Sequence, residues 1–422
     1  MMRFVYIVLA YLIVPFAVAQ LLWRGFRHRD YWRDLPQRFG FGIPPEAAPS
    51  IWVHAVSVGE VQASAPLVRA LRVRYASSPL VLTTVTPTGA QRARELFGAD
   101  VHVRYIPFDL PGSVHRFFER VRPDLAVILE TELWPNLFHA CGRRGVPLVL
   151  ASARISPRSV HRYRRLVGLF RETLSHGIVI AAQSAADAER FTSIGASPER
   201  THVIGNIKFD FELPRGLTEQ AAQLRRQHAD SRPVWIAGST HEGEEELVLD
   251  AHASVRRELN DALLVLVPRH RNRFENVAAL LRRRGIPFVA RSSRQQASER
   301  TEVMLLDTLG ELMTFYAVSD VAFVGGSLVP IGGHNLLEPA ALGLPILTGP
   351  FNFNGEDIAR LFAQVGAANV VGGPRELSAE VLRLLKDQAA RAEMGGAGRK
   401  AIDENRGALQ RLLALIDPLL RS

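Results

Sequence analysis

The stretch PDLAVILETELWPN, residues 123–136, joins a wholly apolar run to a sudden cluster of carboxylates. Leu125–Leu129 contains no polar side chain, which is typical of a strand buried on both faces of a parallel sheet. Glu130 and Glu132 then follow directly, ahead of Pro135. Carboxylates at the end of a buried strand are costly unless they are paired or used in chemistry. They form part of a functional site or complement the dipole of the next helix, and the sequence leaves both interpretations open.

On either side of this stretch, short β-branched runs alternate with amphipathic segments at the spacing of an α/β protein. This alternation predicts parallel sheets with helices on both faces. It falls into two series, so we expect two Rossmann-like domains that face each other across a cleft. Ligands of such sheets bind beyond the carboxyl ends of the strands. The expected strands are 51–56, 80–85, 101–106, 125–130, 147–151, 177–182 and 201–207, then 234–238, 263–267, 286–290, 302–306, 321–325 and 345–348.

The composition is that of an ordinary globular protein. The 422 residues are 47% hydrophobic and 22% charged, which excludes wholesale disorder, collagen-like repeats and a pure coiled coil. The net charge of +9 suits an anionic partner. Cys141 is the single cysteine and can form neither an internal disulfide nor a multi-cysteine zinc site, which favours a reducing compartment. No segment interleaves basic and aromatic residues as nucleic-acid modules do, so we expect no nucleic-acid partner.

An apolar segment opens the chain. No residue from Phe4 to Leu22 is charged at neutral pH, and a helix of that length just spans a hydrocarbon core of about 30 Å. Arginines are concentrated behind it, so the positive-inside rule predicts an uncleaved anchor with the body in the cytoplasm. A cleaved signal peptide, suggested by Ala17-Val18-Ala19, and a helix lying in the membrane surface are the alternatives. The expected parts are an anchor at 1–23, a first domain at 24–212, a linker at 213–232, and a second domain with C-terminal helices at 233–422.

The first strand of the body ends near a glutamate that is a candidate general base. Residues 51–56 run into Ser57-Val58-Gly59-Glu60, so Glu60 is expected at the cleft edge beside a helix start. A carboxylate there can abstract a proton if its pKa suits the task. The same three-residue spacing fits a capping box with Ser57 as N-cap, and the sequence does not separate the two roles.

Lys208 follows the last strand of the first domain and is the only lysine of that domain. A flexible ammonium at a strand end can neutralise a carboxylate or a phosphate. The alternative is a surface ion pair with Asp210 or Glu212. Because nearly every other cation in this chain is arginine, the retained lysine favours the functional role.

Two loops of the second domain suggest phosphate binding. Pro268 stops the strand 263–267, and the basic residues that follow it are expected to face the cleft. Gly332-Gly333-His334-Asn335 precedes a predicted helix at 336–342, and free N–H groups of such a turn can hold a phosphate. Glu338, one turn into that helix, is a candidate acceptor for ribose hydroxyls. The absence of a GKS or GKT motif argues against a nucleotide triphosphatase.

Two other polar clusters have structural interpretations. The run His241–Glu246 lacks the second histidine of a zinc protease motif, and Thr240 with an acidic first turn is typical of helix initiation. Arg282–Arg284 fits a solvated helix end, where cations complement the helix dipole.

Nine segments taken together resemble the Kdo (3-deoxy-D-manno-octulosonic acid) transferases, glycosyltransferase family 30, of lipopolysaccharide assembly. They span nearly the whole chain in family order, and the N-terminal anchor matches too. Each is weak alone, whereas nine in order are specific. The segments are WVHAVSVGE at 52–60, TTVTPTGA at 83–90, ETELWPN at 130–136, GNIKFD at 205–210, GSTHEGEE at 238–245, LVPRH at 266–270, DTLGEL at 307–312, FVGGSL at 323–328 and GGHNLLEPAA at 332–341.

The resemblance implies a GT-B fold, in which the first domain binds the acceptor and the second binds the donor. It implies CMP-Kdo as donor and the membrane lipid IVA as acceptor, at the cytoplasmic face of the bacterial inner membrane. We expect an inverting reaction without cofactor or metal ion, because backbone donors and arginines can neutralise the single phosphate of CMP. The number of Kdo units added is not encoded in these motifs.

The resemblance also assigns roles to residues. Glu60 matches the proton acceptor, and Glu130 and Lys208 match transition-state stabilisers. The CMP-contacting segments correspond to Pro268, Arg269, Leu309, Gly310, Glu311, Asn335, Leu336, Leu337 and Glu338. A basic surface that would attract the phosphorylated acceptor is expected at Arg158, Arg162, Arg164 and Arg165.

Two rival functions follow from the same residues. One is a GT-B transferase or epimerase that uses another nucleotide sugar. The other is a non-catalytic, membrane-tethered protein that binds anionic lipids. Polar clusters at many strand ends favour an enzyme over a scaffold.

Overall fold

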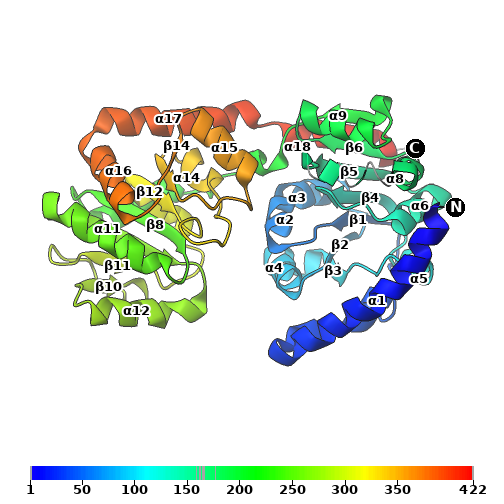
Figure 1. Cartoon of the computed structure of the whole chain (residues 1–422), viewed down its shortest axis with the longest axis horizontal. Coiled ribbons are helices and arrows are strands. Elements are labelled where there is room, and N and C mark those ends of the chain that lie inside the picture. Colours follow the sequence, from blue (N-terminus) through cyan, green and yellow to red (C-terminus); the bar gives the residue numbers. More distant parts are fainter. Residues whose placement is uncertain (1, 158, 161–162, 164–166, 176, 421–422) are drawn as a thin grey trace. The chain divides into compact units, whose positions relative to one another are not determined.

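The computed structural model describes residues 2–157, 159–160, 163, 167–175 and 177–420 (Figure 1). The chain divides into two compact units, of which the first is Met1–Phe211 with Asn405–Ser422 and the second is Glu212–Glu404. Each unit contains one seven-stranded sheet. The four arginines expected to form a basic surface lie outside the described residues: Arg158, Arg162, Arg164 and Arg165.

The chain begins with α1 (Met2–Arg27), whose most apolar window has a mean hydropathy of 2.3. By length and composition α1 is a candidate membrane helix, as the sequence predicts. It lies against the first unit, because the Tyr6 hydroxyl donates to Asp109 Oδ2 at 2.8 Å. Beyond its other end, the Trp32 indole donates to the carbonyl of Leu22 at 2.9 Å.

The first sheet has the strand order β3-β2-β1-β4-β5-β6-β7, and all its neighbouring strands are parallel. The order reverses between β1 and β4, and that switch point is where open α/β sheets bind ligands. The strands are β1 (Ser50–His54), β2 (Leu80–Thr84), β3 (His102–Tyr105), β4 (Pro123–Leu129), β5 (Leu148–Ala153), β6 (Val179–Ala182) and β7 (Thr201–Val203).

Alternating side chains of this sheet enter two hydrophobic cores. In β1, Ile51 and Val53 join the core on one face, whereas Trp52 joins the core on the other. Apolar residues on both faces explain why β1 and β4 read as continuous hydrophobic runs. The first face is covered by α2 (Val58–Ala63), α3 (Ala65–Arg74), α4 (Pro87–Phe97) and α18 (Ala408–Leu420), and the second by α5 (Pro111–Val121), α6 (Pro135–Arg144), α8 (Val167–Leu174) and α9 (Ala185–Ser193).

The second sheet has the order β10-β11-β9-β8-β12-β13-β14, again with parallel neighbours. Its switch point lies between β8 and β12. The strands are β8 (Val234–Thr240), β9 (Leu263–Pro268), β10 (Phe288–Ala290), β11 (Val303–Leu305), β12 (Val321–Val324), β13 (Ile346–Thr348) and β14 (Ala368–Val370). The helices are α10 (Leu217–His228), α11 (Glu244–Glu258), α12 (Phe274–Arg283), α13 (Leu312–Val318), α14 (Leu337–Ala341), α15 (Glu356–Gln364), α16 (Pro374–Lys386) and α17 (Gln388–Asn405).

Every strand expected from the sequence is present, with boundaries shifted by a few residues. The additional strand is β14, a short edge strand in which the polar residue Asn369 interrupts the apolar run. The expected linker also differs, since residues 217–228 form α10, whose apolar residues pack against the second sheet. Its polar composition reflects a helix with one buried side.

The C-terminal helices do not all belong to the second unit, which corrects the expected domain boundary. Helix α18 packs on the first sheet, where Leu412 and Ile416 enter the core. Asp210 accepts hydrogen bonds from the N–H groups of Gly407 and Leu409, at 2.6 and 2.7 Å, and so caps this helix. Burial of its apolar face on the first sheet explains the chain's return to that unit.

Candidate active site

Glu60 occupies the first turn of α2, directly beyond the end of β1. Its Oε2 accepts a hydrogen bond from the N–H of Val56 at 2.8 Å, and its Oε1 accepts one from the Ser57 hydroxyl at 3.2 Å. Ser57 in turn caps the helix by accepting from the Glu60 N–H. The capping box is therefore present. The carboxylate that completes it is also the candidate general base, so the two interpretations left open by the sequence do not exclude each other.

The position of Glu60 changes its acidity. Burial raises the pKa of the Glu60 carboxyl to about 7, and the charges of Glu130 and Glu132 add to that rise. The hydrogen bonds from Val56 and Ser57 act in the opposite direction. A carboxylate that titrates near neutral pH is well suited to general base catalysis.

Glu130 and Lys208 form an ion pair beside Glu60. Lys208 Nζ donates to Glu130 Oε1 at 2.7 Å, and both side chains are about one quarter exposed, at 25% and 23%. Glu130 has a left-handed backbone with φ of +58°, a conformation that is uncommon for a residue other than glycine. The alternative that the sequence offered, a surface ion pair of Lys208 with Asp210 or Glu212, is not what the structure shows, because Lys208 pairs with Glu130 and Asp210 caps α18.

Asn206 shapes the turn that carries Lys208. Its side-chain carbonyl accepts from the Lys208 N–H at 3.0 Å, and its amide donates to Gln183 at 3.2 Å. The Gln183 amide donates to the carbonyl of Ser152 at 2.9 Å. Because Ser152 lies near the end of strand β5 while Gln183 and Asn206 follow β6 and β7, these hydrogen bonds fix the lysine at the carboxyl edge of the sheet.

A cavity of about 260 Å³ opens at this edge. Glu60 and Glu130 both line it, as does Glu132, whose pKa is raised by burial to about 7. Arg154, directly after β5, brings a cation to the same cavity. The other lining residues are Thr131, Ser156, Ser159 and Tyr163.

The three residues predicted to be catalytic lie near one another, and Arg154, which lines the same cavity, was not among the predicted residues. The structure brings Glu60, Glu130 and Lys208 together at the switch point of the first sheet. Arg154 follows the expected strand 147–151 by a few residues, so the rule of examining strand ends contained the necessary signal. Because nearly every cation of this chain is arginine, a single arginine after a strand did not stand out in the sequence.

In the second unit, the carboxylate of Glu244 organises the loop after β12. Glu244 is fully buried and accepts hydrogen bonds from the N–H groups of Gly326, Ser327 and Leu328, at 2.7, 3.1 and 2.9 Å. It also accepts from the His241 N–H at 3.2 Å. The interpretation of residues 241–246 as ordinary helix initiation was therefore incomplete, because long-range contacts bury this glutamate.

Three histidines gather beyond β8, β9 and β12. His241 Nε2 and His334 Nε2 lie 2.7 Å apart, so one imidazole donates and the other accepts. The His270 ring packs edge-on to His241, with centroids 5.2 Å apart. Burial lowers the pKa of all three rings, and the Arg269 charge lowers them further; His334 titrates at about 3.

The glycine turn does not offer the free donors that the sequence suggested. The N–H groups of Gly332 and Gly333 both donate to the carbonyl of Gly326, at 3.1 and 2.8 Å. Both glycines have positive φ, at +111° and +74°, which this tight return requires. The expected role of these two amides as phosphate donors is not available in this conformation.

The remaining segments expected to contact CMP lie on loops and helix starts. Pro268 ends β9, and the N–H of Arg269 donates to the carbonyl of Thr240 at 3.0 Å. The side chain of Arg269 is exposed to solvent.

The loop after β11 carries Leu309, which is 69% exposed, and Gly310, which has φ of +85°. Glu311 follows and is bound by the Arg291 guanidinium through Nη2 at 2.9 Å and Nε at 3.1 Å. The loop thus presents an exposed leucine and a carboxylate whose orientation is fixed.

At the start of α14, Asn335 donates to Glu338 Oε1 at 3.1 Å and accepts from the Leu337 N–H. The side chains of Leu336 and Leu337 are buried, so a ligand can reach these two residues only through their backbone.

The fold defines the class of protein. Two successive Rossmann-like units with ligand-type loops beyond the strand ends are typical of the GT-B class of nucleotide-sugar enzymes. The UDP-GlcNAc 2-epimerase from Neisseria meningitidis, solved bound to UDP-GlcNAc, has a similar fold. It matches with a TM-score of 0.59 and 14% sequence identity, over 87% of this chain and 99% of that chain.

Sequence comparison identifies the family within this class. The family model "3-Deoxy-D-manno-octulosonic-acid transferase (kdotransferase)" matches residues 33–211. The 3-deoxy-D-manno-octulosonic acid transferase of Haemophilus influenzae is 41% identical over 100% of this chain and 99% of its own length. That of Bordetella pertussis is 37% identical over 94% and 95%. The chain therefore belongs to the Kdo transferase family and is a glycosyltransferase.

Proposed function

We propose that this protein transfers Kdo from CMP-Kdo to lipid IVA in an inverting, metal-independent reaction. The observation that carries the proposal is the position of Glu60, a half-buried carboxylate beside Glu130 and Glu132 at the switch point of the first sheet. Its raised pKa lets it accept a proton near neutral pH and keeps the base reactive. The names of the relatives support Kdo as the transferred sugar.

In the proposed step, Glu60 takes the proton from an acceptor hydroxyl as the hydroxyl oxygen attacks the anomeric carbon of Kdo. The bond from that carbon to the phosphate oxygen breaks, and CMP leaves with the electron pair. Attack opposite the leaving group inverts the anomeric configuration. Because Glu130 contributes to the raised pKa of Glu60, its pairing with Lys208 adjusts the strength of the base.

Lys208 also suits the charge of the donor sugar. Kdo carries a carboxylate next to the carbon that becomes cationic in the transition state, and an ammonium can hold that carboxylate. Lys208 is partly exposed, and its turn is held by hydrogen bonds that run through Asn206 and Gln183 to the end of β5. Exchange of its partner from Glu130 to the substrate would couple donor arrival to the acidity of the base.

The second unit supplies groups for a nucleotide with one phosphate. Arg269 is exposed at the end of β9, and Asn335 holds Glu338 at the start of α14. Arginines and backbone donors can neutralise one phosphate without a metal ion. Full activity in excess EDTA is expected, and loss of activity that added Mg²⁺ restores would contradict metal independence.

The membrane location of the acceptor agrees with α1. A lipid with acyl chains stays in the bilayer, and a candidate membrane helix at the N-terminus keeps the enzyme at the same surface. We place the catalytic unit at the cytoplasmic face of the inner membrane, where arginines behind α1 favour retention.

The decisive experiment compares Glu60→Gln with the wild-type enzyme. Glutamine can preserve the capping box but cannot accept the proton, so we expect kcat to fall by about 10³-fold while CMP binding persists. Products formed from CMP-Kdo and lipid IVA would be identified by mass spectrometry. Glu95→Gln, at an exposed position of α4, is the matched control and should retain activity. Normal turnover by Glu60→Gln would remove the assigned base.

A further inference from the structure

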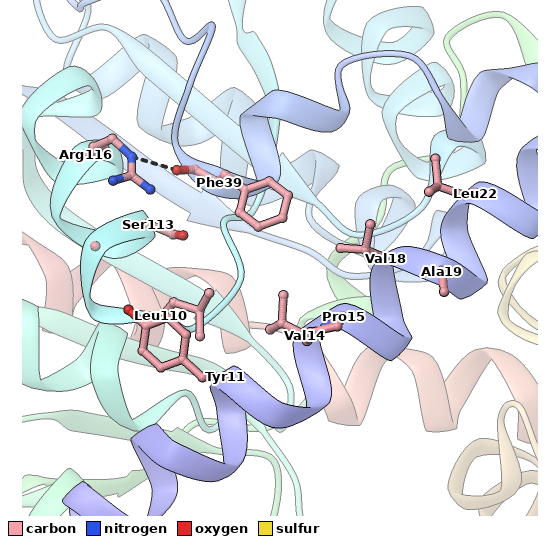
Figure 2. Close-up of a pocket in the computed structure, with 11 residues that line it drawn as sticks. Tyr11, Val14, Pro15, Val18, Ala19, Leu22, Phe39, Leu110, Ser113 and Arg116 are labelled. Carbon is pink, nitrogen blue, oxygen red and sulfur yellow. Dashed lines mark hydrogen bonds between the residues drawn. The ribbon is translucent and has the colours of Figure 1, made fainter.

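A cavity of about 620 Å³ separates the middle of α1 from the body of the first unit (Figure 2). Its volume lies in the range of small-molecule sites. Figure 2 shows Val14 and Val18 pointing from α1 toward Leu110 and Phe39 on the opposite wall. The remaining lining residues are Tyr11, Pro15, Ala19, Leu22, Gly112, Ser113 and Arg116. We call this cavity the α1 groove.

The α1 groove lies between two fixed points. On the N-terminal side, Tyr6 donates to Asp109, and Arg3 donates to the Asn136 side chain at 3.3 Å. Asp109 is itself fixed, because it accepts the N–H groups of Asn136 and Leu137 at 2.9 and 2.8 Å. Hydrogen bonds thus tie the start of α1 to the first turn of α6.

On the C-terminal side, the Trp32 indole donates to Leu22 O and packs directly against Gly25, where an added Cβ would lie 1.8 Å from the indole nitrogen. The chain therefore folds back tightly at the end of α1. With contacts at both ends of the helix, the space along its middle is a feature of the packing.

The chemistry of the groove is that of an amphiphile site. The lining is almost wholly apolar, and Arg116 is its single charged residue. The Arg116 guanidinium is held in place, since its Nε donates to Phe39 O at 2.9 Å and its Cζ lies 4.1 Å from the centroid of the Phe41 ring. Among the residues that the structure describes, no carboxylate forms an ion pair with it. One cation thus stands at an apolar cavity.

We propose that the α1 groove binds one acyl chain of an anionic membrane phospholipid whose phosphate lies at Arg116. A lipid is the occupant that the surroundings of α1 favour. The helix exposes large apolar side chains, such as Phe4 at 70% and Phe16 at 77%, and a membrane would cover them with acyl chains. One cation matches one phosphate, as in phosphatidylglycerol, whereas lipid IVA carries two. The bound lipid fills the space between the helix and the body and stabilises their contact. This inference does not depend on the catalytic assignment.

The experiment uses the full-length protein in nanodiscs of phosphatidylethanolamine and phosphatidylglycerol, with a photoactivatable diazirine in the acyl chain of the phosphatidylglycerol. Lipid around the outside of α1 reaches exposed residues such as Ile13, whereas only a chain inside the groove reaches the body wall at Leu110. We expect adducts on the peptide that contains Leu110 and Ser113. Adducts confined to exposed residues of α1 would overturn the proposal.

Two variants sharpen the result. Val18→Trp fills the groove and should abolish the adduct on the Leu110 peptide, whereas Ile13→Trp, on the exposed side, should leave it intact. Arg116→Gln keeps the cavity and should abolish the preference for phosphatidylglycerol over phosphatidylethanolamine carrying the same diazirine. An adduct that resists Val18→Trp, or that an equal amount of lipid IVA displaces, would show that a phospholipid is not the occupant. Circular dichroism establishes that each variant is folded, and the intact mass establishes that it carries the intended substitution.

Discussion

The two units share a parallel architecture but differ in several of the titratable residues that follow their strands. In the first unit, Glu60 and Glu132 are carboxylates whose pKa values are raised by burial to about 7. In the second, His241 and His334 are imidazoles whose pKa values are lowered by burial and by neighbouring cations. Glu60 and Glu132 therefore take up protons near neutral pH, whereas His241 and His334 are neutral rings beside arginines.

The difference shows how one scaffold can serve two halves of a reaction. The topology fixes where the loops gather, and the residues on those loops decide whether the site attracts protons or anions. The carboxylates differ too, because Glu60 lines a cavity, whereas Glu244 accepts hydrogen bonds from four backbone N–H groups. A glutamate thus lines a cavity in one unit and holds a loop in place in the other.

Removal of the structural carboxylate should produce the largest change in stability. Glu244→Ala leaves the N–H groups of residues 326–328 without their partner, at about 1 kcal/mol each, so we expect a loss of about 3 kcal/mol. Urea denaturation measures this. Glu242→Ala, at a neighbouring position that is 87% exposed, should change stability by less than about 0.5 kcal/mol. Equal effects of the two variants would contradict the structural role.

Glu60→Gln should increase stability at high pH. A carboxylate whose pKa rises on folding from 4.5 to about 7 binds its proton more tightly when folded, so stability falls as pH rises through that window. Replacement by the neutral amide removes this cost, and we expect a gain on the order of 2 kcal/mol at pH 8. The gain should vanish at pH 4. Chemical denaturation at both pH values tests the sign, and a destabilised variant at pH 8 would contradict the burial argument.

The pH dependence of turnover should follow the ionisation of Glu60 in the first unit. Because the proposed base must be ionised and the pKa of Glu60 is about 7, the rate should rise with pH and be about tenfold lower at pH 6 than at pH 8. Lys208→Ala leaves Glu130 without its cation, raises the pKa of Glu60 further and should move the profile to higher pH. Steady-state rates from pH 5.5 to 9 measure both, and a profile that falls with rising pH would exclude a carboxylate base.

The smallest effect is expected at the C-terminal helix. Asp210→Ala removes the carboxylate that accepts from Gly407 and Leu409, and loss of such a cap costs about 1 kcal/mol. The first unit should be destabilised, since α18 belongs to it. Hydrogen exchange followed by mass spectrometry would show faster exchange in α18. Faster exchange limited to α17 would contradict the assignment of α18 to the first unit.

Much of the fold was predictable because the spacing of apolar residues along the chain reveals which segments are buried strands and which are amphipathic helices. The apolar runs of β1 and β4 and the alternating helices identify parallel sheets directly. Glu60, Glu130 and Lys208 were singled out by examining strand ends. The family resemblance carried by nine ordered segments then predicted Glu60 as proton acceptor and the other two as transition-state stabilisers. Arg154 was missed although it also follows a strand. Edge strand β14, in which the polar residue Asn369 interrupts the apolar run, was also missed.

By itself, then, the sequence determined the two parallel sheets, the apolar N-terminal helix, the capping box at Glu60 and the family. These features depend on residues close together in the chain, whose spacing reveals burial and local hydrogen bonding. Only the tertiary structure decided that Lys208 pairs with Glu130, that Glu244 holds a loop some eighty residues away, that α18 returns to the first sheet, and that a groove lies under α1. Periodicity shows that a side chain is buried, but the partner that buries it is fixed by packing between distant segments.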